Sequence, residues 1–374
     1  MGERGKPRVA FIIPGLGAVN RGAEAFVKEL AKRLQNKYDI TILSRGVTEL
    51  SLSHRTIKVI PRDNTLTNHI YSLHPFWAKV FNGLFLDPLN IEMLTSAVAS
   101  FGTVSDNFDL IFPVCGVWGA ITARFVRAIR NVPFIHCGYA GLERAEYWVA
   151  RQRPDMYVAL TSVAQRWIQA KVPGINCTMV PNGVDVQRFA PTSRKENLSL
   201  DRPIYLCVAA LVPLKRVELA IRAVGRLQKG SLLVLGDGPL RSSILHLGKQ
   251  ILGDGRFLLK SVPYSQMPRY YSSCDVFTLP SKVEGFGIAY LEAMASGKPV
   301  VAPKDEIREE IVGKSGILCN VQDIAEYANC LEVAARTNFG DVPRKRAEQF
   351  SWETVASKYD EVFRQVLEKR ALHV

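Results

Sequence analysis

Short apolar runs alternate with longer amphipathic stretches along the whole chain. In the first half, the apolar runs predict strands at residues 8–13, 40–43, 57–60, 110–114, 133–136, 156–160 and 178–180. The stretches between them predict helices, as at 22–35 and 117–130. Such alternation is typical of a parallel sheet covered by crossover helices. Residues 62–108 have weaker periodicity, so we expect a loop with irregular helix there.

The alternation restarts after a polar stretch at residues 188–202, which indicates a linker. Further strands are predicted at 204–209, 231–235, 257–259, 276–279, 299–302 and 316–318, each followed by a predicted helix. Residues 351–372 carry apolar side chains at helical spacing beyond the last strand. The pattern therefore predicts an α/β chain with two doubly wound domains that face an interdomain cleft.

The composition fits such a chain and narrows its setting. The 374 residues are 47% hydrophobic and 22% charged, an ordinary balance for a globular chain. The longest apolar stretch, 110–121, is too short for a transmembrane helix. Basic residues precede the first apolar run, as in a signal peptide, but Pro14 and Gly15 interrupt it, and we interpret it as a buried strand.

The seven cysteines are scattered without a C-x-x-C pair, so we expect free thiols in a reducing, cytoplasmic compartment. The six histidines form no cluster, and no metal site is predicted. The net charge is +13, and residues 1–200 carry 24 Lys and Arg against 15 Asp and Glu, a difference of +9. This excess favours anionic partners such as nucleic acid, an anionic membrane or a phosphorylated substrate.

The first predicted strand leads into a glycine-containing junction at residues 14–24. Gly15, Gly17 and Gly22 give the spacing G-x-G-x-x-x-x-G, which lets backbone amides approach an anion at a helix N-terminus. The spacing differs from the G-x-G-x-x-G of dinucleotide-binding folds, and no P-loop Gly-Lys-Ser/Thr follows. The alternative interpretation is a turn that holds no ligand.

A more specific pattern lies at residues 281–301. A strand ends near Pro280, a glycine loop follows, and a helix is predicted from about Gly287 to Ser296. Such a loop presents its amides and the helix N-terminus to a phosphate. Glu284 falls in the loop and Glu292 on the helix, and we expect both to face a wet cleft. Taken singly, each is more often a solvated carboxylate.

Taken together, this stretch resembles the E-x7-E signature of retaining glycosyltransferases of family 4, which have the GT-B architecture of two Rossmann-like domains facing a cleft. Other segments resemble the family in the same order: Pro181-Asn182-Gly183-Val184-Asp185, the loop from Ala210 to Arg216, Gly236-Asp237-Gly238-Pro239 and Phe350-Ser351-Trp352. The chain departs from the family at Ala210, Ser261 and Arg21, which leaves the donor open.

The resemblance implies an acceptor-binding domain over 1–195, a nucleotide-sugar domain over 196–350, and a C-terminal helix over 351–374 that packs back on the first domain. It implies catalytic roles for Glu284, His136 and Lys215. The residues that it implies for donor binding are Gly15, Gly17, Lys215, Arg216, Gly236, Gly238, Val262, Glu284, Gly285, Phe286, Gly287, Ile288 and Glu292.

Within that set, the resemblance implies that Glu284 contacts hydroxyls of the donor sugar and that Glu292 accepts hydrogen bonds from the ribose. Lys215, with Arg216, supplies positive charge to the departing diphosphate. His136 ends an apolar strand, where related enzymes use a histidine to contact the donor sugar. The alternative is a satisfied core histidine.

The resemblance thus implies a retaining glycosyltransferase that moves a hexose from a nucleotide diphosphate sugar, with UDP-glucose as the leading donor. The resemblance also implies a glycan or lipid-linked acceptor in polysaccharide biosynthesis. It further implies that the protein makes peripheral contact with the inner face of the membrane. No aspartates have the D-x-D spacing that holds a divalent ion in metal-dependent transferases, so neither a metal nor another cofactor is expected.

Three other classes stay open at this point. A nucleotide-sugar epimerase or hydrolase would use the same architecture. A nucleic-acid-binding protein is suggested only by the basic charge, without a recognisable binding motif. An NAD-dependent oxidoreductase is disfavoured by the glycine spacing at the first junction.

Overall fold

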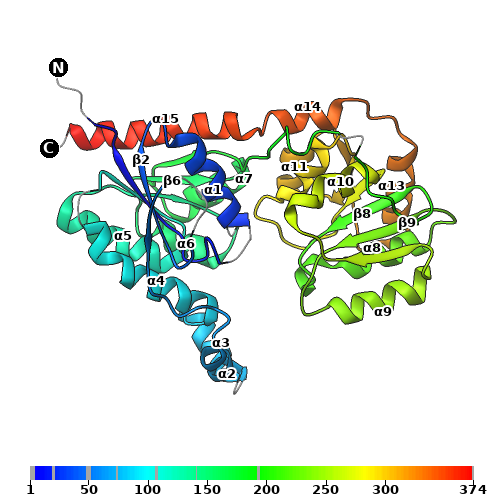
Figure 1. Cartoon of the computed structure of the whole chain (residues 1–374), viewed down its shortest axis with the longest axis horizontal. Helices are drawn as coiled ribbons and strands as arrows, with labels where there is room; N and C mark the ends of the chain where they lie inside the picture. The colour runs from blue at the N-terminus through cyan, green and yellow to red at the C-terminus, as the bar shows by residue number, and fades with distance from the viewer. Residues whose placement is uncertain are drawn as a thin grey trace. The chain divides into compact units, whose positions relative to one another are not determined.

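Parallel sheets covered by helices form both halves of the chain in the computed structural model (Figure 1). The structure describes residues 5–18, 22–47, 52–72, 75–105, 108–139, 141–191 and 194–372. The chain divides into two units, which we call unit 1 (Met1–Pro181 with Val355–Val374) and unit 2 (Asn182–Thr354). The boundary expected at 195/196 therefore falls inside unit 2.

Within its described residues, unit 1 contains seven short parallel strands. They are β1 (Arg8–Ile12), β2 (Asp39–Ser44), β3 (Ser53–Thr56), β4 (Leu110–Pro113), β5 (Ile135–Cys137), β6 (Met156–Ala159) and β7 (Cys177–Met179). They form the sheets β3-β2-β1-β4 and β5-β6-β7, which a parallel bridge between Ile111 and Phe134 connects. The helices are α1 (Gly22–Leu34), α2 (Thr65–Ser72), α3 (Pro75–Gly83), α4 (Pro88–Ser105), α5 (Gly116–Arg130), α6 (Arg144–Ala150), α7 (Ser162–Lys171) and α15 (Trp352–Ala371).

Unit 2 is built on a six-stranded parallel sheet in the order β10-β9-β8-β11-β12-β13. Its strands are β8 (Ile204–Val208), β9 (Ser231–Leu235), β10 (Phe257–Lys260), β11 (Val276–Thr278), β12 (Val300–Pro303) and β13 (Gly316–Cys319). Its helices are α8 (Val217–Gly225), α9 (Arg241–Leu252), α10 (Met267–Ser273), α11 (Ile288–Ala295), α12 (Glu306–Val312), α13 (Ile324–Arg336) and α14 (Val342–Glu348), with single turns η1 (Pro213–Lys215) and η2 (Tyr264–Gln266).

Both strand orders are doubly wound, because each sheet grows outward in both directions from its first strand. The order reverses between β1 and β4 in unit 1 and between β8 and β11 in unit 2. Ligands of doubly wound sheets bind outside the carboxyl ends of the strands at this switch point. The loops after β8 and β11 are therefore where a ligand of unit 2 is expected.

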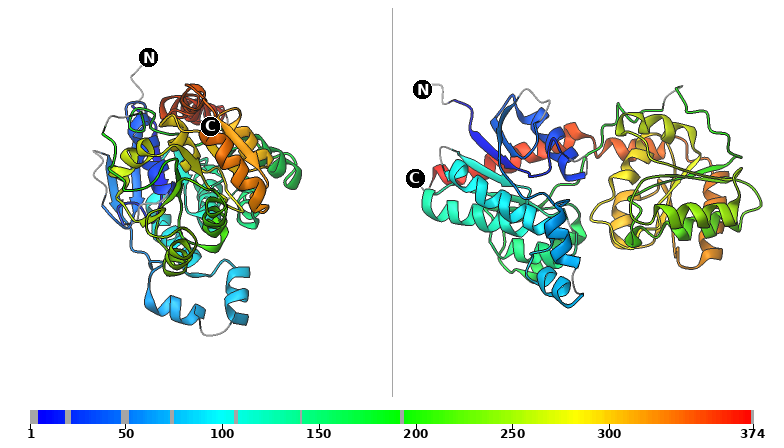
Figure 2. Two further views of the ribbon diagram at one scale, coloured as in Figure 1. Left: turned by 90° about the vertical axis from the view of Figure 1, so that its right-hand side faces the viewer. Right: turned by 60° about the horizontal axis from the view of Figure 1, so that its bottom comes forward.

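Two features of unit 1 differ from the sequence-based prediction. The prediction of a strand at 57–60 is wrong, because β3 lies at Ser53–Thr56. This edge strand is mostly exposed and polar, so it carries no apolar signal, while Ile57 is buried directly after it. The region expected as loop and irregular helix contains α2, α3 and α4, and Figure 2 shows the α2–α3 hairpin standing away from the rest of unit 1.

The C-terminal helix α15 packs on unit 1. The Tyr38 hydroxyl donates to Asp360 Oδ1 at 2.8 Å, and Lys37 Nζ donates to Asp360 Oδ2 at 2.7 Å. The fully buried ring of Phe363 lies 5.8 Å from that of Phe112, on the central strand β4. Helix α15 thus supplies part of the aromatic core of unit 1.

All seven cysteines lie in the described residues and are free thiols. Among the described helices, none combines the length and the apolar character that spanning a membrane requires.

The core position of Phe363 predicts its effect on stability. Replacing Phe363 with Ala should lower the free energy of unfolding of unit 1 by about 3–5 kcal/mol, because it removes a buried ring and leaves a cavity. Denaturant unfolding followed by circular dichroism measures the change. Glu361→Ala, at an exposed position of the same helix, is the control. Equal losses for both variants would show that α15 is not part of this core.

Candidate active site

An ion pair lies at the switch point of unit 2. Lys215 ends the η1 turn after β8, and Glu284 lies in the loop after β11. Lys215 Nζ donates to Glu284 Oε1 at 2.6 Å, and the two side chains are 24% and 10% exposed. The structure therefore brings together a cation and a carboxylate where the topology directs a ligand.

The backbone fixes these two loops against each other. The Lys282 amide donates to the Leu214 carbonyl at 2.8 Å. Arg216 has a left-handed φ of 48°, and its Nε donates to the Pro280 carbonyl at 2.8 Å. Arg216 was expected to contact a diphosphate, but this Nε is committed to the loop backbone. The observed contact of Arg216 therefore connects the loop after β8 with the loop after β11.

The glycine loop leads into α11. Gly287 has a left-handed φ of 88°, and a Cβ there would lie 2.5 Å from the ring of Tyr290, so the position requires glycine. Gly285 and Ile288 are half-buried, while Phe286 is buried and its ring lies 5.9 Å from that of Phe350. An anion could therefore contact the loop backbone and the first amides of α11. The Phe286 side chain is packed inside and is not available to it.

Glu292 does not face a wet cleft, and that expectation was wrong. The residue is 5% exposed, and its carboxylate accepts hydrogen bonds from Tyr271 at 2.7 Å and Tyr264 at 2.9 Å. Burial raises the pKa of Glu292 to about 7, although both tyrosines and the charge of Arg188 act to lower it. The carboxyl group is therefore held in place and titrates near neutral pH.

Tyr264 connects Glu292 to the loop after β10. Val262 is half-buried in that loop, two residues before Tyr264. The guanidinium carbon of Arg188 lies 4.3 Å from the centre of the Tyr264 ring. The expected base-binding loop and the expected ribose-binding carboxylate are thus joined through one tyrosine.

The glycines of the Gly236–Pro239 turn pack against the loop that follows β8. A Cβ at Gly236 would lie 1.9 Å from the Ala209 carbonyl oxygen, and one at Gly238 would lie 2.7 Å from that of Leu211. The Leu211 amide in turn donates to the Asp237 carbonyl at 2.8 Å. These two glycines let the turn contact the loop that leads to Lys215.

The remaining predicted site residues belong to unit 1. Gly15 and Gly17 lie in the loop after β1, and Gly17 has a left-handed φ of 79°. A Cβ at Gly17 would lie 2.3 Å from the Val47 carbonyl oxygen, so glycine is required for its close approach to the loop after β2.

His136 lies in the core of unit 1. It is 2% exposed, its Nε2 lies 3.9 Å from Glu146 Oε2, and its ring lies 6.0 Å from that of Tyr157. Burial lowers the pKa of His136 to about 4, so the ring is neutral at pH 7. The side chain is therefore buried, but its Nδ1 has no hydrogen-bond partner among the described residues, and its assigned contact with the donor sugar stays a prediction.

Sequence reasoning missed the residues that hold the site loops. Arg308 is 3% exposed, and it donates through Nη2 to the Ser281 carbonyl at 2.7 Å and through Nε to the Tyr290 hydroxyl at 3.1 Å. Its position three residues after the helix-capping Asp305 indicates a helix start but no site. Tyr271 was also missed, since a tyrosine in an apolar pattern resembles a core residue. Among the described residues, no group of three or more His, Cys, Asp or Glu could hold a metal ion.

Two family profiles of known proteins together match most of the chain. A family profile described as "Glycosyltransferase Family 4" matches residues 20–188, and one described as "Glycosyl transferases group 1" matches residues 189–345. The structure is also similar to sucrose-phosphate synthase from Thermosynechococcus elongatus, with a TM-score of 0.80 and 19% identity over 97% of this chain and all of that one. A structure of Anabaena Alr3699/HepE in complex with UDP and glucose gives a TM-score of 0.71 at 17% identity, over 96% of this chain and all of that one.

Among curated proteins, the chain is 31% identical over 179 residues to the GDP-mannose-dependent alpha-(1-6)-phosphatidylinositol monomannoside mannosyltransferase of Mycolicibacterium smegmatis. This match covers 42% of the chain and 47% of that relative, so the alignment spans about half the length of the relative.

The fold and the two profile matches define the chain as a glycosyltransferase with the two-domain GT-B fold, as the resemblance implied. It carries a glycosyltransferase family 4 domain over residues 20–188 and a glycosyltransferase group 1 domain over residues 189–345.

The buried carboxyl group of Glu292 predicts a pH dependence of stability. Its pKa of about 7 lies above the ordinary value of 4.5, so between these values the folded state holds a proton that the unfolded state lacks. The stabilisation is complete below about pH 4.5 and is lost as the pH rises through 7, by on the order of 3 kcal/mol.

Glu292→Gln removes this titration, so the free energy of unfolding of wild type relative to the variant should fall between pH 5 and pH 8. Denaturant titrations at several pH values measure the difference. Glu309→Gln, at an exposed position, is the control and should follow the wild type. Parallel pH curves for wild type and Glu292→Gln would contradict the assignment.

Proposed function

We propose that this protein transfers a hexose from a nucleotide diphosphate sugar to an acceptor hydroxyl. The observation that carries the proposal is the ion pair of Lys215 and Glu284 at the switch point of unit 2, beside the N-terminus of α11. The profile matches to glycosyltransferases support the reaction class.

The leaving group sets the main demand on the site. Transfer breaks the bond between the anomeric carbon and a phosphate oxygen, and negative charge builds on the diphosphate. Lys215 supplies a positive charge there, and the amides at the start of α11 supply oriented donors. Since Glu284 uses one of the three N–H donors of Lys215, the other two remain for phosphate oxygens.

We further propose retention at the anomeric carbon by front-side attack. In this scheme the acceptor oxygen bonds to the anomeric carbon, and its proton passes to the departing phosphate, so the protein needs no nucleophile. Glu284 would orient sugar hydroxyls, and Glu292, fixed by Tyr264 and Tyr271, would accept from the ribose. Neither a metal nor another cofactor takes part.

Two donors are supported by different observations. UDP-glucose follows from the family resemblance and is consistent with the UDP and glucose named for the Anabaena structure. GDP-mannose is the donor named for the Mycolicibacterium relative, which is 31% identical over 179 residues. The name of the same relative includes a phosphatidylinositol glycoside, which supports a lipid-linked acceptor for this chain. With such an acceptor, we propose a peripheral position at the inner membrane face.

The donor is tested by a thermal-shift screen with UDP-glucose, GDP-mannose, ADP-glucose and dTDP-glucose, followed by product analysis with and without acceptor. A ligand at 100 times its dissociation constant stabilises the folded state by about 2.7 kcal/mol, so one nucleotide should raise the melting temperature clearly above the others. Glu284→Gln should keep this shift and lower the turnover number, because contacts that strengthen in the transition state affect turnover.

The product analysis separates the alternatives. An epimerised or hydrolysed donor that forms equally without acceptor would overturn the transferase assignment. The assay is run with and without EDTA, and a strict requirement for magnesium or manganese would overturn the proposed leaving-group chemistry.

The role of Lys215 gives a separate prediction. Lys215→Ala should weaken nucleoside diphosphate binding about tenfold or more and leave nucleoside binding within about twofold, because it removes only a charge complementary to phosphate. Calorimetry with the diphosphate and the nucleoside of the preferred donor measures both. Lys282→Ala, an exposed lysine of the facing loop, is the matched control. Equal weakening of both ligands would contradict a phosphate contact.

A further inference from the structure

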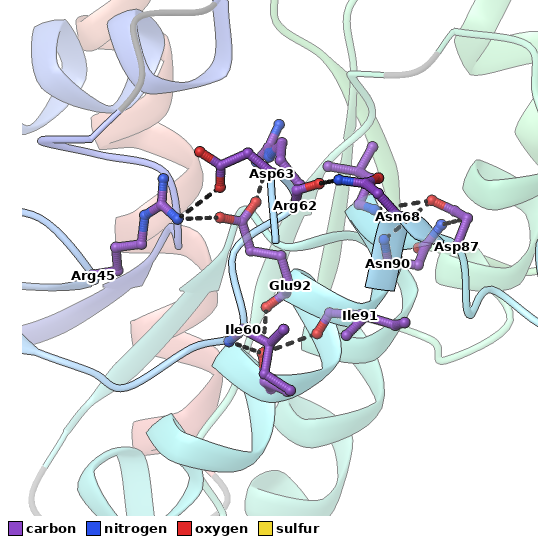
Figure 3. Close-up of polar contacts among 11 residues, drawn as sticks. Arg45, Ile60, Arg62, Asp63, Asn68, Asp87, Asn90, Ile91 and Glu92 are labelled. Carbon is purple, nitrogen blue, oxygen red and sulfur yellow. Dashed lines mark hydrogen bonds and ion pairs between the residues drawn. The ribbon is translucent and has the colours of Figure 1, made fainter. Parts of the chain in front are cut away.

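Glu92 and Glu292 are both buried, but different groups hold their carboxylates. Figure 3 shows Glu92 of α4 facing Arg62 and Arg45, which directly follows β2. Arg62 Nε donates to Glu92 Oε2, and Arg45 Nη1 lies 3.6 Å from Glu92 Oε1. Arg45 Nη1 also lies 3.6 Å from Asp63 Oδ1. Two arginines and two carboxylates leave this cluster without net charge, which indicates a structural role in unit 1.

The carboxylate of Glu292 is held by hydroxyl groups instead. Tyr271 donates to its Oε2 at 2.7 Å, and Tyr264 donates to its Oε1 at 2.9 Å. Glu292 is only 5% exposed, so another donor has almost no surface at which to reach either oxygen. A ribose hydroxyl is the same kind of donor as a tyrosine hydroxyl. The proposed contact between Glu292 and the ribose therefore requires one of the two tyrosines to leave.

The two tyrosines differ in how firmly the protein holds them. Tyr271 of α10 is fully buried, and its ring lies 5.6 Å from that of Phe189 and 5.8 Å from that of Phe277. Moving Tyr271 away from Glu292 would open a cavity in the core of unit 2. Tyr264 is 47% exposed and begins the single turn η2. Its side chain can rotate into solvent and leave the core intact.

Two neighbours support the ring of Tyr264 in its observed position. The guanidinium carbon of Arg188 lies 4.3 Å from the centre of the ring, and the ring of Phe189 lies 5.8 Å away. Arg188 is exposed, and a cation–π contact at an exposed position is weak. These contacts favour the observed position of Tyr264, but a competing hydroxyl group can displace it.

We propose that the hydroxyl group of Tyr264 occupies the position on Glu292 that a ribose hydroxyl of the donor takes, and that nucleotide binding rotates Tyr264 away. This inference rests on the proposed function, because it concerns the nucleoside end of the same donor site. Tyr271 stays in place and orients the carboxylate for the ribose.

The exchange has a consequence for affinity. One hydrogen bond to Glu292 is broken for each one that the ribose makes, so the nucleotide binds less tightly than the ribose contact alone would allow. After transfer, the return of Tyr264 to Glu292 competes with the ribose and favours release of the nucleoside diphosphate. Tyr264 is thus a residue that weakens nucleotide binding, whereas Tyr271 strengthens it.

Tyrosine-to-phenylalanine substitutions test this role, because each removes one hydroxyl group and keeps the ring. The variants are Tyr264→Phe and Tyr271→Phe. Tyr270→Phe is the matched control, since Tyr270 lies on the same helix as Tyr271 and its hydroxyl group bonds to Glu196. Calorimetry at pH 8.5, above the Glu292 pKa of about 7, measures binding of UDP, GDP and ADP and of their 2′,3′-dideoxy counterparts. Thermal melting of each variant checks its fold.

We expect Tyr264→Phe to bind a ribonucleotide about threefold to tenfold more tightly than wild type, because the ribose no longer competes with a hydroxyl group. Its affinity for the dideoxy counterpart should stay within about twofold, since that ligand brings no hydroxyl group to Glu292. Tyr271→Phe should weaken ribonucleotide binding about threefold or more, because the carboxylate loses its fixed donor. Tyr270→Phe should stay within about twofold of wild type for both ligands.

Unchanged or weaker ribonucleotide binding by Tyr264→Phe would overturn the proposal, since its hydroxyl group would then not compete with the ribose. An equal gain for the dideoxy counterpart would overturn it too. If none of the three nucleotides binds to wild type or to Tyr264→Phe, the nucleotide site of the proposed function fails, and this proposal fails with it. Binding of a nucleotide without the gain contradicts only the role of Tyr264.

Discussion

Parallel pairing of the strands is the constraint from which the candidate sites follow. When all strands of a sheet run in one direction, their carboxyl ends and the following helix N-termini gather at one edge. In unit 2 this edge collects the loops that carry Lys215, Glu284 and the start of α11. In unit 1 it collects Gly17 and Arg45. The chemistry differs between the units, but the reason for its position is the same.

The sequence predicted most of this architecture because buried parallel strands are continuous apolar runs. Nearly every predicted strand lies within two residues of the observed one, and α15 was expected as a helix. The polar edge strand β3 gave no such signal, because only buried strands need apolar side chains on both faces. Likewise, the sequence predicted only a loop with irregular helix where α2, α3 and α4 lie, because exposed and buried positions are mixed there.

At the site, spacing located the loops but could not predict burial. Glu284 and Lys215 lie together, but nothing in the sequence indicates that Tyr264 and Tyr271 enclose Glu292. The burial of His136 was likewise not predictable, since a histidine at the end of a strand is compatible with a binding site or with the core. The burial of a residue depends on side chains that are distant in sequence. A local sequence pattern carries no information about those side chains.

The path of the last helix affects how the protein can be divided. The first three residues of α15 belong to unit 2, where Trp352 packs against Gly183, and the rest belongs to unit 1. A fragment of residues 182–354 would keep its sheet and its own core. A fragment of residues 1–181 would expose the aromatic surface that Tyr359 and Phe363 cover, with the ring of Phe112 at its centre. The two halves of this chain are therefore unequal as independent folding units, and only the second is continuous in sequence.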